Sequence, residues 1–103
     1  MSRSIIQDKE EHYCYLCALL EGRAWQQSMI LEEHHIMFGI KWRRKSEHYG
    51  LKIYLCPEHH RTGKNAVHRD KDTRLLTQKI AQYAFEKKYG HEKWMQEFGK
   101  NFL

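Results

Sequence analysis

The fold of this chain is decided by two short runs, Cys14-Tyr15-Leu16-Cys17 near its start and Cys56-Pro57-Glu58-His59-His60 past its middle. Each run spaces two metal-binding side chains three positions apart, as in one half of a tetrahedral zinc site. Together they predict a structural Zn²⁺ ion bound by Cys14, Cys17, Cys56 and His59. The spacing favours His59 over His60 as the fourth ligand, although either histidine is feasible.

Two other uses of the cysteines fit the sequence less well. Buried free thiols would require both half-motifs to match by accident. A redox-active C-x-x-C lacks the strand-and-helix pattern that surrounds it in thioredoxin-like proteins. The chain has three cysteines, an odd number that disulfides cannot pair completely, so metal binding in a reducing compartment is the favoured interpretation.

Length and composition limit the classes of protein that are possible. A chain of 103 residues with 41% hydrophobic content predicts one small domain over 1–103, with a modest core that zinc would help to stabilise. The net charge of +5 favours a polyanionic partner, either nucleic acid or an acidic membrane surface. No apolar run is long enough for a signal peptide or a membrane span, so we expect an intracellular protein in the cytoplasm of its host cell.

The hydrophobic pattern predicts an α+β chain. A strand is expected in the later part of residues 25–36, and a second strand at 51–55. The stretch 38–50 between them has glycine at both ends and predicts a loop. Pro57 is expected at the first position of a helix that carries His59 and His60. A turn at 63–68 and helices at 72–89 and 91–98 complete the order.

Several histidines exceed what one four-coordinate ion can use. His34, His35 and His60 remain after the zinc ligands are assigned, and this surplus predicts a second, chemically active metal site. Partly buried structural histidines are the alternative. His68 is a possible further ligand for metal or phosphate, but an ordinary surface histidine is the simpler interpretation.

These motifs resemble a known family. The run Glu33-His34-His35-Ile36 at the end of a strand, followed by C-x-x-H-H at the start of a helix, is similar to zinc-containing HNH endonucleases, in particular the short versions carried by phages and prophages. The resemblance implies a ββα-metal core over 14–68, stapled by the Cys₃His zinc site, with a helical C-terminal extension over 70–103. It also implies hydrolysis of phosphodiester bonds in DNA.

The resemblance assigns a role to each surplus histidine. His35 would be the general base that deprotonates a water molecule, a task suited to a neutral imidazole. His34 and His60 would bind a catalytic divalent ion such as Mg²⁺ or Mn²⁺, which neutralises charge on the phosphate. Because adjacent strand residues point to opposite faces, a bend or bulge before Gly39 would be needed for His34 and His35 to converge.

The chain departs from the family at one position. The family's central asparagine orients the base histidine and braces the loop, but no asparagine lies between His35 and Cys56. Ser46, Glu47 and His48 are the residues that could replace it, and the sequence does not choose among them.

A cluster of cations lies beside the expected active site. Lys41, Arg43, Arg44 and Lys45 surround Trp42 and predict a clamp on the DNA backbone, with Trp42 available to pack or stack. A solvated loop is the alternative. Two rival functions also remain: a catalytically decayed zinc module that binds DNA or protein, and a zinc-ribbon interaction domain, which would leave His34, His35 and His60 without a role.

Overall fold

The computed structural model describes residues 3–22 and 30–103. The elements follow in the order η1 (Lys9–Glu11), α1 (Tyr15–Glu21), β1 (Glu32–His35), α2 (Arg43–His48), β2 (Lys52–Leu55), η2 (Glu58–Thr62), α3 (Lys71–Tyr89) and α4 (His91–Phe98). A two-stranded antiparallel sheet with helices around it confirms the predicted α+β class. Both expected strands are present, while positions 25–29 of the segment assigned to the first strand lie outside the described residues.

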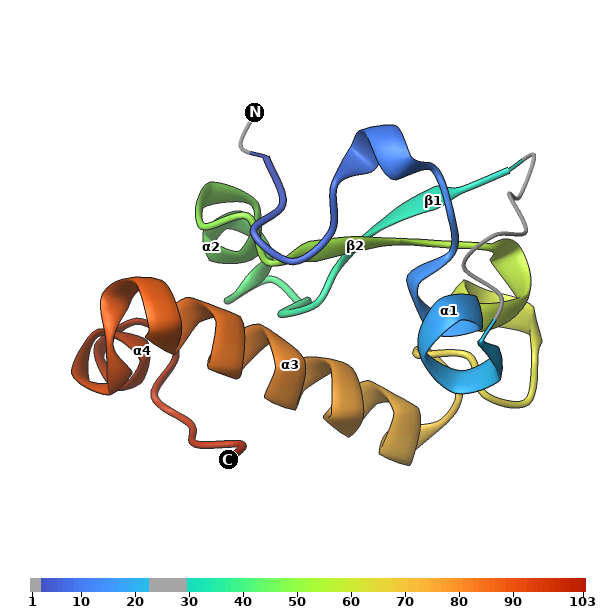
Figure 1. Ribbon diagram of the computed structural model, residues 1–103. Helices are drawn as coiled ribbons and strands as arrows, with labels where there is room; N and C mark the ends of the chain where they lie inside the picture. Colours follow the sequence, from blue (N-terminus) through green and yellow to red (C-terminus); the bar gives the residue numbers. More distant parts are fainter. Residues whose placement is uncertain (1–2, 23–29) are drawn as a thin grey trace.

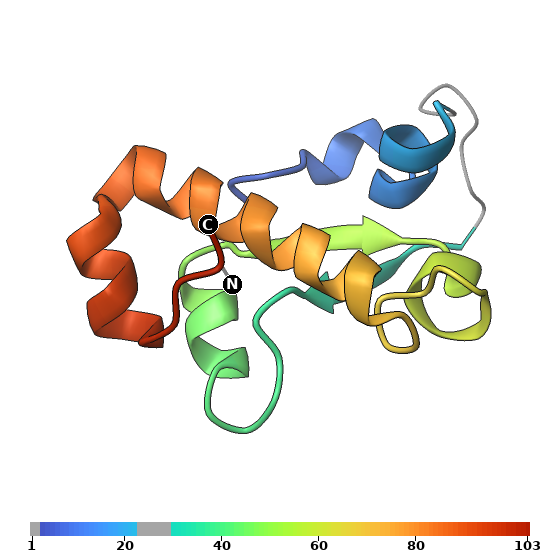
Figure 2. The same cartoon turned by 90° about the horizontal axis from the view of Figure 1, so that it is seen from below.

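The two strands form a thin sheet with different residues on its two faces. They pair antiparallel, with His34 opposite Ile53 and His35 opposite Lys52. Alternation therefore places His34 and Ile53 on one face and His35 and Lys52 on the other. The N-terminal segment lies on one side of the sheet and α3 on the other (Figure 1). The view from below shows α3 crossing in front of the sheet (Figure 2).

The core lies between the sheet and the C-terminal helices. Ile53 and Leu55 from β2 are fully buried, as are Ala81 and Phe85 from α3. Helix α4 turns back from the end of α3, so that Trp94 stacks 4.3 Å from Phe98 and 5.3 Å from Phe85, measured between ring centroids. This packing joins the C-terminal helices to the same core as the strands.

The N-terminal segment is held against the sheet by specific hydrogen bonds. The Oγ atom of Ser4 donates to the carbonyl of Lys52 at 2.6 Å, and the Ile5 amide donates to the carbonyl of Gly50 at 2.9 Å. Gly50 has a φ of +73°, and a Cβ atom there would lie 2.2 Å from the carbonyl oxygen of Arg3. Glycine is therefore required at this position for the segment to dock.

The structure differs from the expected loop at 38–50, because it contains the helix α2. The glycines at 39 and 50 bound the segment, but 43–48 has no glycine or proline, and its residues tolerate a helix. Trp42 fixes the start of this helix through edge contacts with Phe98 and Phe102, at 6.2 and 6.5 Å between ring centroids. The contacts of Trp42 with distant residues thus favour a helix in a segment whose local sequence is compatible with either a loop or a helix.

Two other helices also depart from expectation. Helix α1 follows directly from the first cysteine pair, with Cys14 as its N-cap and Gly22 in the left-handed conformation at its end. The helix expected from Pro57 is a five-residue π-type turn, η2, which ends at Thr62. Within the described ranges, no helix is long and apolar enough to cross a membrane.

Candidate metal centres and nucleic-acid interface

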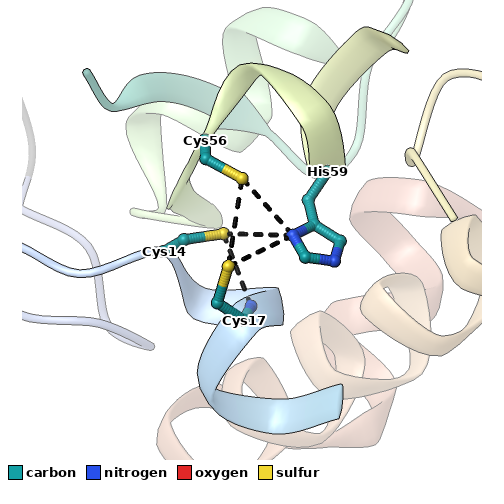
Figure 3. Close-up of side chains that lie close together, drawn as sticks. All are labelled: Cys14, Cys17, Cys56 and His59. Atoms are coloured by element: carbon teal, nitrogen blue, oxygen red, sulfur yellow. Dashed lines mark hydrogen bonds between the residues drawn. The ribbon is translucent and has the colours of Figure 1, made fainter. Parts of the chain in front are cut away.

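The four side chains predicted to bind zinc come together in one cluster. Helix α1 and its N-cap supply Cys17 and Cys14, while Cys56 follows β2 and His59 lies on η2 (Figure 3). The Nδ1 atom of His59 lies 3.7, 3.4 and 3.4 Å from the sulfur atoms of Cys14, Cys17 and Cys56, respectively. The sulfur atoms of Cys17 and Cys56 are 3.9 Å apart.

These distances match the edges of a zinc tetrahedron. Ordinary zinc bond lengths give sulfur–sulfur edges of about 3.8 Å and sulfur–nitrogen edges of about 3.6 Å. The cluster therefore has the shape and the donor atoms of a structural zinc site. Of the two predicted metal ions, the structural Zn²⁺ is the one that this geometry supports directly.

A carboxylate fixes the orientation of His59. The Nε2 atom of His59 lies 3.0 Å from a carboxylate oxygen of Glu21 at the end of α1. When Nε2 carries the proton and donates it to Glu21, Nδ1 presents its lone pair to the three sulfur atoms. A carboxylate that accepts a hydrogen bond from the other ring nitrogen is typical of zinc-bound histidines. Glu21 was not predicted from the sequence, although its position one helical turn after Cys17 is a usable signal.

The thiols of Cys17 and Cys56 resist ionisation in the absence of a cation. Burial raises the pKa of Cys17 to about 12, and the neighbouring thiolates of Cys14 and Cys56 contribute to the rise. Burial is also the main cause that raises the pKa of Cys56. Three thiolates this close repel each other, so a divalent cation is the group that would allow all three to be charged.

A second cluster contains three histidines, His34, His60 and His68. The Nε2 atoms of His60 and His68 are 3.1 Å apart. The ring of His34 lies 5.1 Å from that of His60 and 5.0 Å from that of His68, between centroids. His34 is only 2% exposed, and its buried Nε2 atom has no hydrogen-bond partner among the described residues. An orphaned buried nitrogen beside two imidazoles fits a metal ligand.

The predicted ligands His34 and His60 are thus brought together, and His68 joins them. His68 is exposed, as expected of a surface histidine, and its ring also lies beside those of His34 and His60. The signal that could have found it is the turn at 63–68, which returns the chain to η2. There the Val67 amide donates to the carbonyl of His59 at 2.9 Å.

Glu32 orients His60 as Glu21 orients His59. The Nδ1 atom of His60 lies 2.7 Å from a Glu32 carboxylate oxygen, and Arg61 also donates to that carboxylate. These hydrogen bonds lower the pKa of Glu32. A Nδ1–H donor to Glu32 leaves the lone pair of His60 on Nε2, which faces His68. The π-type turn η2 therefore directs two adjacent histidines into two different clusters.

The environment favours the neutral form of His34 and His68. Burial lowers the pKa of His34 to about 3, with additional contributions from His60, His68 and His35. Burial also lowers the pKa of His68, assisted by His60 and Arg74. A neutral imidazole is the form that binds metals. Three imidazole nitrogens favour a first-row transition ion such as Mn²⁺, Co²⁺ or Zn²⁺ over Mg²⁺, which prefers oxygen ligands.

His35 lies on the opposite face of β1 from His34, and the expected bend that would bring them to one side is absent. Its Nε2 atom is 2.7 Å from Glu47 Oε1 and 3.6 Å from Glu33 Oε1. A Nε2–H group that donates to Glu47 leaves Nδ1 as the nitrogen with the free lone pair. In that tautomer, a carboxylate orients the ring of His35 and Nδ1 can accept a proton.

Glu47 and Ser46 make the contacts that the resemblance would require of residues replacing the absent asparagine. Glu47 contacts the imidazole of His35, as described above. The Oγ atom of Ser46 accepts from the Met37 amide at 3.2 Å and donates to the carbonyl of Leu51 at 2.5 Å, which braces the segment between the strands. The third residue considered, His48, is exposed and packs its ring against Tyr49.

A buried lysine balances the carboxylates around His35. Lys52 is 2% exposed, and its Nζ atom lies 3.0 Å from Glu47 and 3.4 Å from Glu33. Its ammonium group occupies the position that a second cation would need between these carboxylates. Glu33, Glu47 and Lys52 therefore form an ion-pair network that no sequence pattern predicted.

The predicted DNA-binding residues divide into two sets. Lys41, Arg43 and Arg44 are exposed, and both arginines line a hollow of about 700 Å³ together with His35 and Glu47. Lys45 instead donates to the main chain of Glu97 at 2.6 Å.

Trp42 belongs to the fold as well. Its ring packs against the core, and its Nε1 atom is buried without a hydrogen-bond partner among the described residues. Trp42 and Lys45 contact α4. The exposed basic surface therefore consists of Lys41, Arg43 and Arg44. Of the two uses predicted for Trp42, packing is the one that the structure shows.

Comparison with known proteins gives no relative for this chain: no family model, curated protein or solved structure matches it.

Proposed function

We propose that this chain is a metal-dependent endonuclease of the HNH type, which hydrolyses phosphodiester bonds in DNA inside its host cell. The observation that carries the proposal is the cluster of His34, His60 and His68, with a buried Nε2 atom that has no partner among the described residues. The carboxylate-held imidazole of His35 is the adjacent residue in sequence. Metal-binding nitrogens beside an oriented base are the components that phosphodiester hydrolysis requires.

His34 and His35 lie on opposite faces of β1, yet both side chains could reach one phosphate. In the described part of the chain, β1 pairs only with β2, so its other edge has no strand beside it. A phosphodiester that lies across this free edge would meet His34 on one side of the strand and His35 on the other. His35, at the end of this strand, lines the hollow that also contains Arg43 and Arg44.

Each residue then has a defined task. The Nδ1 atom of His35 accepts a proton from the attacking water, while Glu47 holds the ring and stabilises the charge that develops on it. Arg43 and Arg44 bind neighbouring phosphates. A divalent ion held by His34, His60 and His68 would supply positive charge for the pentavalent phosphate and the leaving oxygen. The Cys₃His zinc site holds α1, β2 and η2 together.

The test is cleavage of supercoiled plasmid by zinc-loaded protein with added Mn²⁺, Co²⁺ or Mg²⁺, beside an EDTA control and the variant His35→Ala. We expect metal-dependent nicking that His35→Ala reduces by about 10²–10⁴-fold. Absence of cleavage with every metal would overturn the enzyme and leave the alternative, a zinc-containing module that binds DNA or protein without cutting.

A further inference from the structure

Ile40 has an unusual position for an aliphatic residue. It lies at the tip of the turn between β1 and α2 and is 106% exposed, the highest fraction among the large exposed hydrophobic residues in the described ranges. Gly39, which has a φ of +98°, reverses the chain just before it. The entire side chain therefore projects from the surface.

The surroundings of Ile40 are basic. Lys41, Arg43 and Arg44 are exposed beside it, and no acidic residue occurs from 36 to 46. Ile40 also lines the same hollow of about 700 Å³ as His35 and the two arginines. An apolar tip flanked by three exposed cations in the same turn and helix start matches a polyanion that has an apolar interior, which is the chemistry of stacked base pairs between two phosphate chains.

The turn that carries Ile40 is firmly anchored. The amides of Trp42 and Arg43 both donate to the carbonyl of Gly39, at 3.2 and 3.0 Å. The ring of Trp42 is fixed against Phe98 and Phe102. A β-branched side chain also has few rotamers to lose. Inserting this tip into a partner would therefore cost little conformational entropy.

We infer that Ile40 is a wedge that inserts between adjacent base pairs of double-stranded DNA from the minor groove. This inference rests on the proposed function. Lys41, Arg43 and Arg44 bind the flanking phosphates while the wedge unstacks one step and bends the duplex. Proteins that insert aliphatic wedges in this way bend DNA by about 20–90°. The bend would present the strained backbone to the edge of β1.

The experiment uses duplexes in which 2-aminopurine replaces adenine at successive positions, together with end-labelled duplexes that report bending by energy transfer. Zinc-loaded protein is added without any other divalent ion. Wild type should raise 2-aminopurine fluorescence and shorten the end-to-end distance. Ile40→Ala should lose both signals, while its affinity changes by less than about tenfold, because the lost contact is offset by the avoided unstacking.

Two control variants accompany it. Ile40→Leu keeps an aliphatic wedge and should retain both signals. Leu103→Ala removes another exposed aliphatic side chain, 58% exposed at the far end of the chain, and should behave as wild type. If Ile40→Ala unstacks and bends DNA as well as wild type does, the wedge is wrong even when cleavage is observed. If wild type does not bind duplex DNA, both the wedge and the proposed function fail.

Discussion

His59 and His60 are adjacent in the chain, yet their imidazoles belong to different clusters. Nδ1 of His59 lies 3.4 Å from the sulfur of Cys56, whereas Nε2 of His60 lies 3.1 Å from Nε2 of His68. A carboxylate orients each ring, Glu21 for His59 and Glu32 for His60. One short turn thereby couples a structural site to a candidate catalytic site, so the zinc site should determine whether the second cluster exists at all.

The first prediction concerns the zinc site. Purified protein should contain about one tightly bound zinc per chain, and chelation or Cys56→Ser should unfold it. Structural zinc sites of this kind contribute on the order of 10 kcal/mol to folding, more than a small domain can lose. Metal analysis and circular dichroism measure both effects. A zinc-free preparation that still unfolds cooperatively would contradict this prediction.

A second prediction concerns DNA affinity. The double variant Arg43→Ala/Arg44→Ala should weaken binding and reduce the slope of log affinity against log salt by about two units, one for each phosphate contact. Lys64→Ala changes an exposed cation outside this surface and serves as the control. Fluorescence anisotropy at several salt concentrations provides the slopes. An unchanged slope in the double variant would identify these arginines as ordinary solvated side chains.

Glu47 supplies a third prediction. Glu47→Gln keeps an oxygen that can accept from His35 but removes the charge that stabilises the protonated ring. We therefore expect a lower cleavage rate, by about tenfold or more, with DNA affinity and zinc content unchanged. Glu58→Gln, an exposed acid at the start of η2, should cleave as wild type does. Equal rates for Glu47→Gln and wild type would show that Glu47 serves only the ion pair with Lys52.

The fourth prediction is a pH dependence of stability. Glu97 accepts a hydrogen bond from Tyr49 Oη at 2.6 Å, which is the main cause that lowers the pKa of Glu97 below 4.5 and raises that of Tyr49 to about 12. Because the folded-state pKa is lowered, the ionised carboxylate adds stability above pH 4.5, and this stability is lost as the pH falls below that value.

Glu97→Gln should therefore lose less stability than wild type between about pH 5 and pH 3. Urea unfolding at each pH measures the difference, and zinc release at low pH affects both proteins alike. Parallel pH curves for the two proteins would mean that Glu97 titrates normally in the folded state.

The metal-binding half-motifs allowed the most reliable predictions from sequence. Cys14, Cys17, Cys56 and His59 assemble as their spacing indicates, because the local turn geometry of C-x-x-C and C-x-x-H sets the ligand directions. The strand at Lys52–Leu55 also follows from alternation, and the strand at Glu32–His35 from the apolar residues that flank it. Local pattern was sufficient for both features.

The features that the sequence did not predict depend on contacts between distant residues. His68 joins the second cluster only because the turn after η2 folds back. Trp42 packs against the core because α4 and the residues after it return to contact its ring, and no local signal reports such a contact. The side-chain alternation that predicted opposite faces for His34 and His35 did hold, since the strand continues without a bulge.

The most direct test of the nuclease proposal pairs cleavage with metal analysis in His60→Ala. This variant removes one of the three histidines of the second cluster and leaves every zinc ligand in place. His91→Ala, which replaces an exposed histidine on α4, is the control. We predict that His60→Ala remains folded with one zinc, binds DNA, and loses metal-dependent cleavage, whereas His91→Ala cleaves as wild type. Cleavage by folded His60→Ala at the wild-type rate would contradict the proposed metal centre.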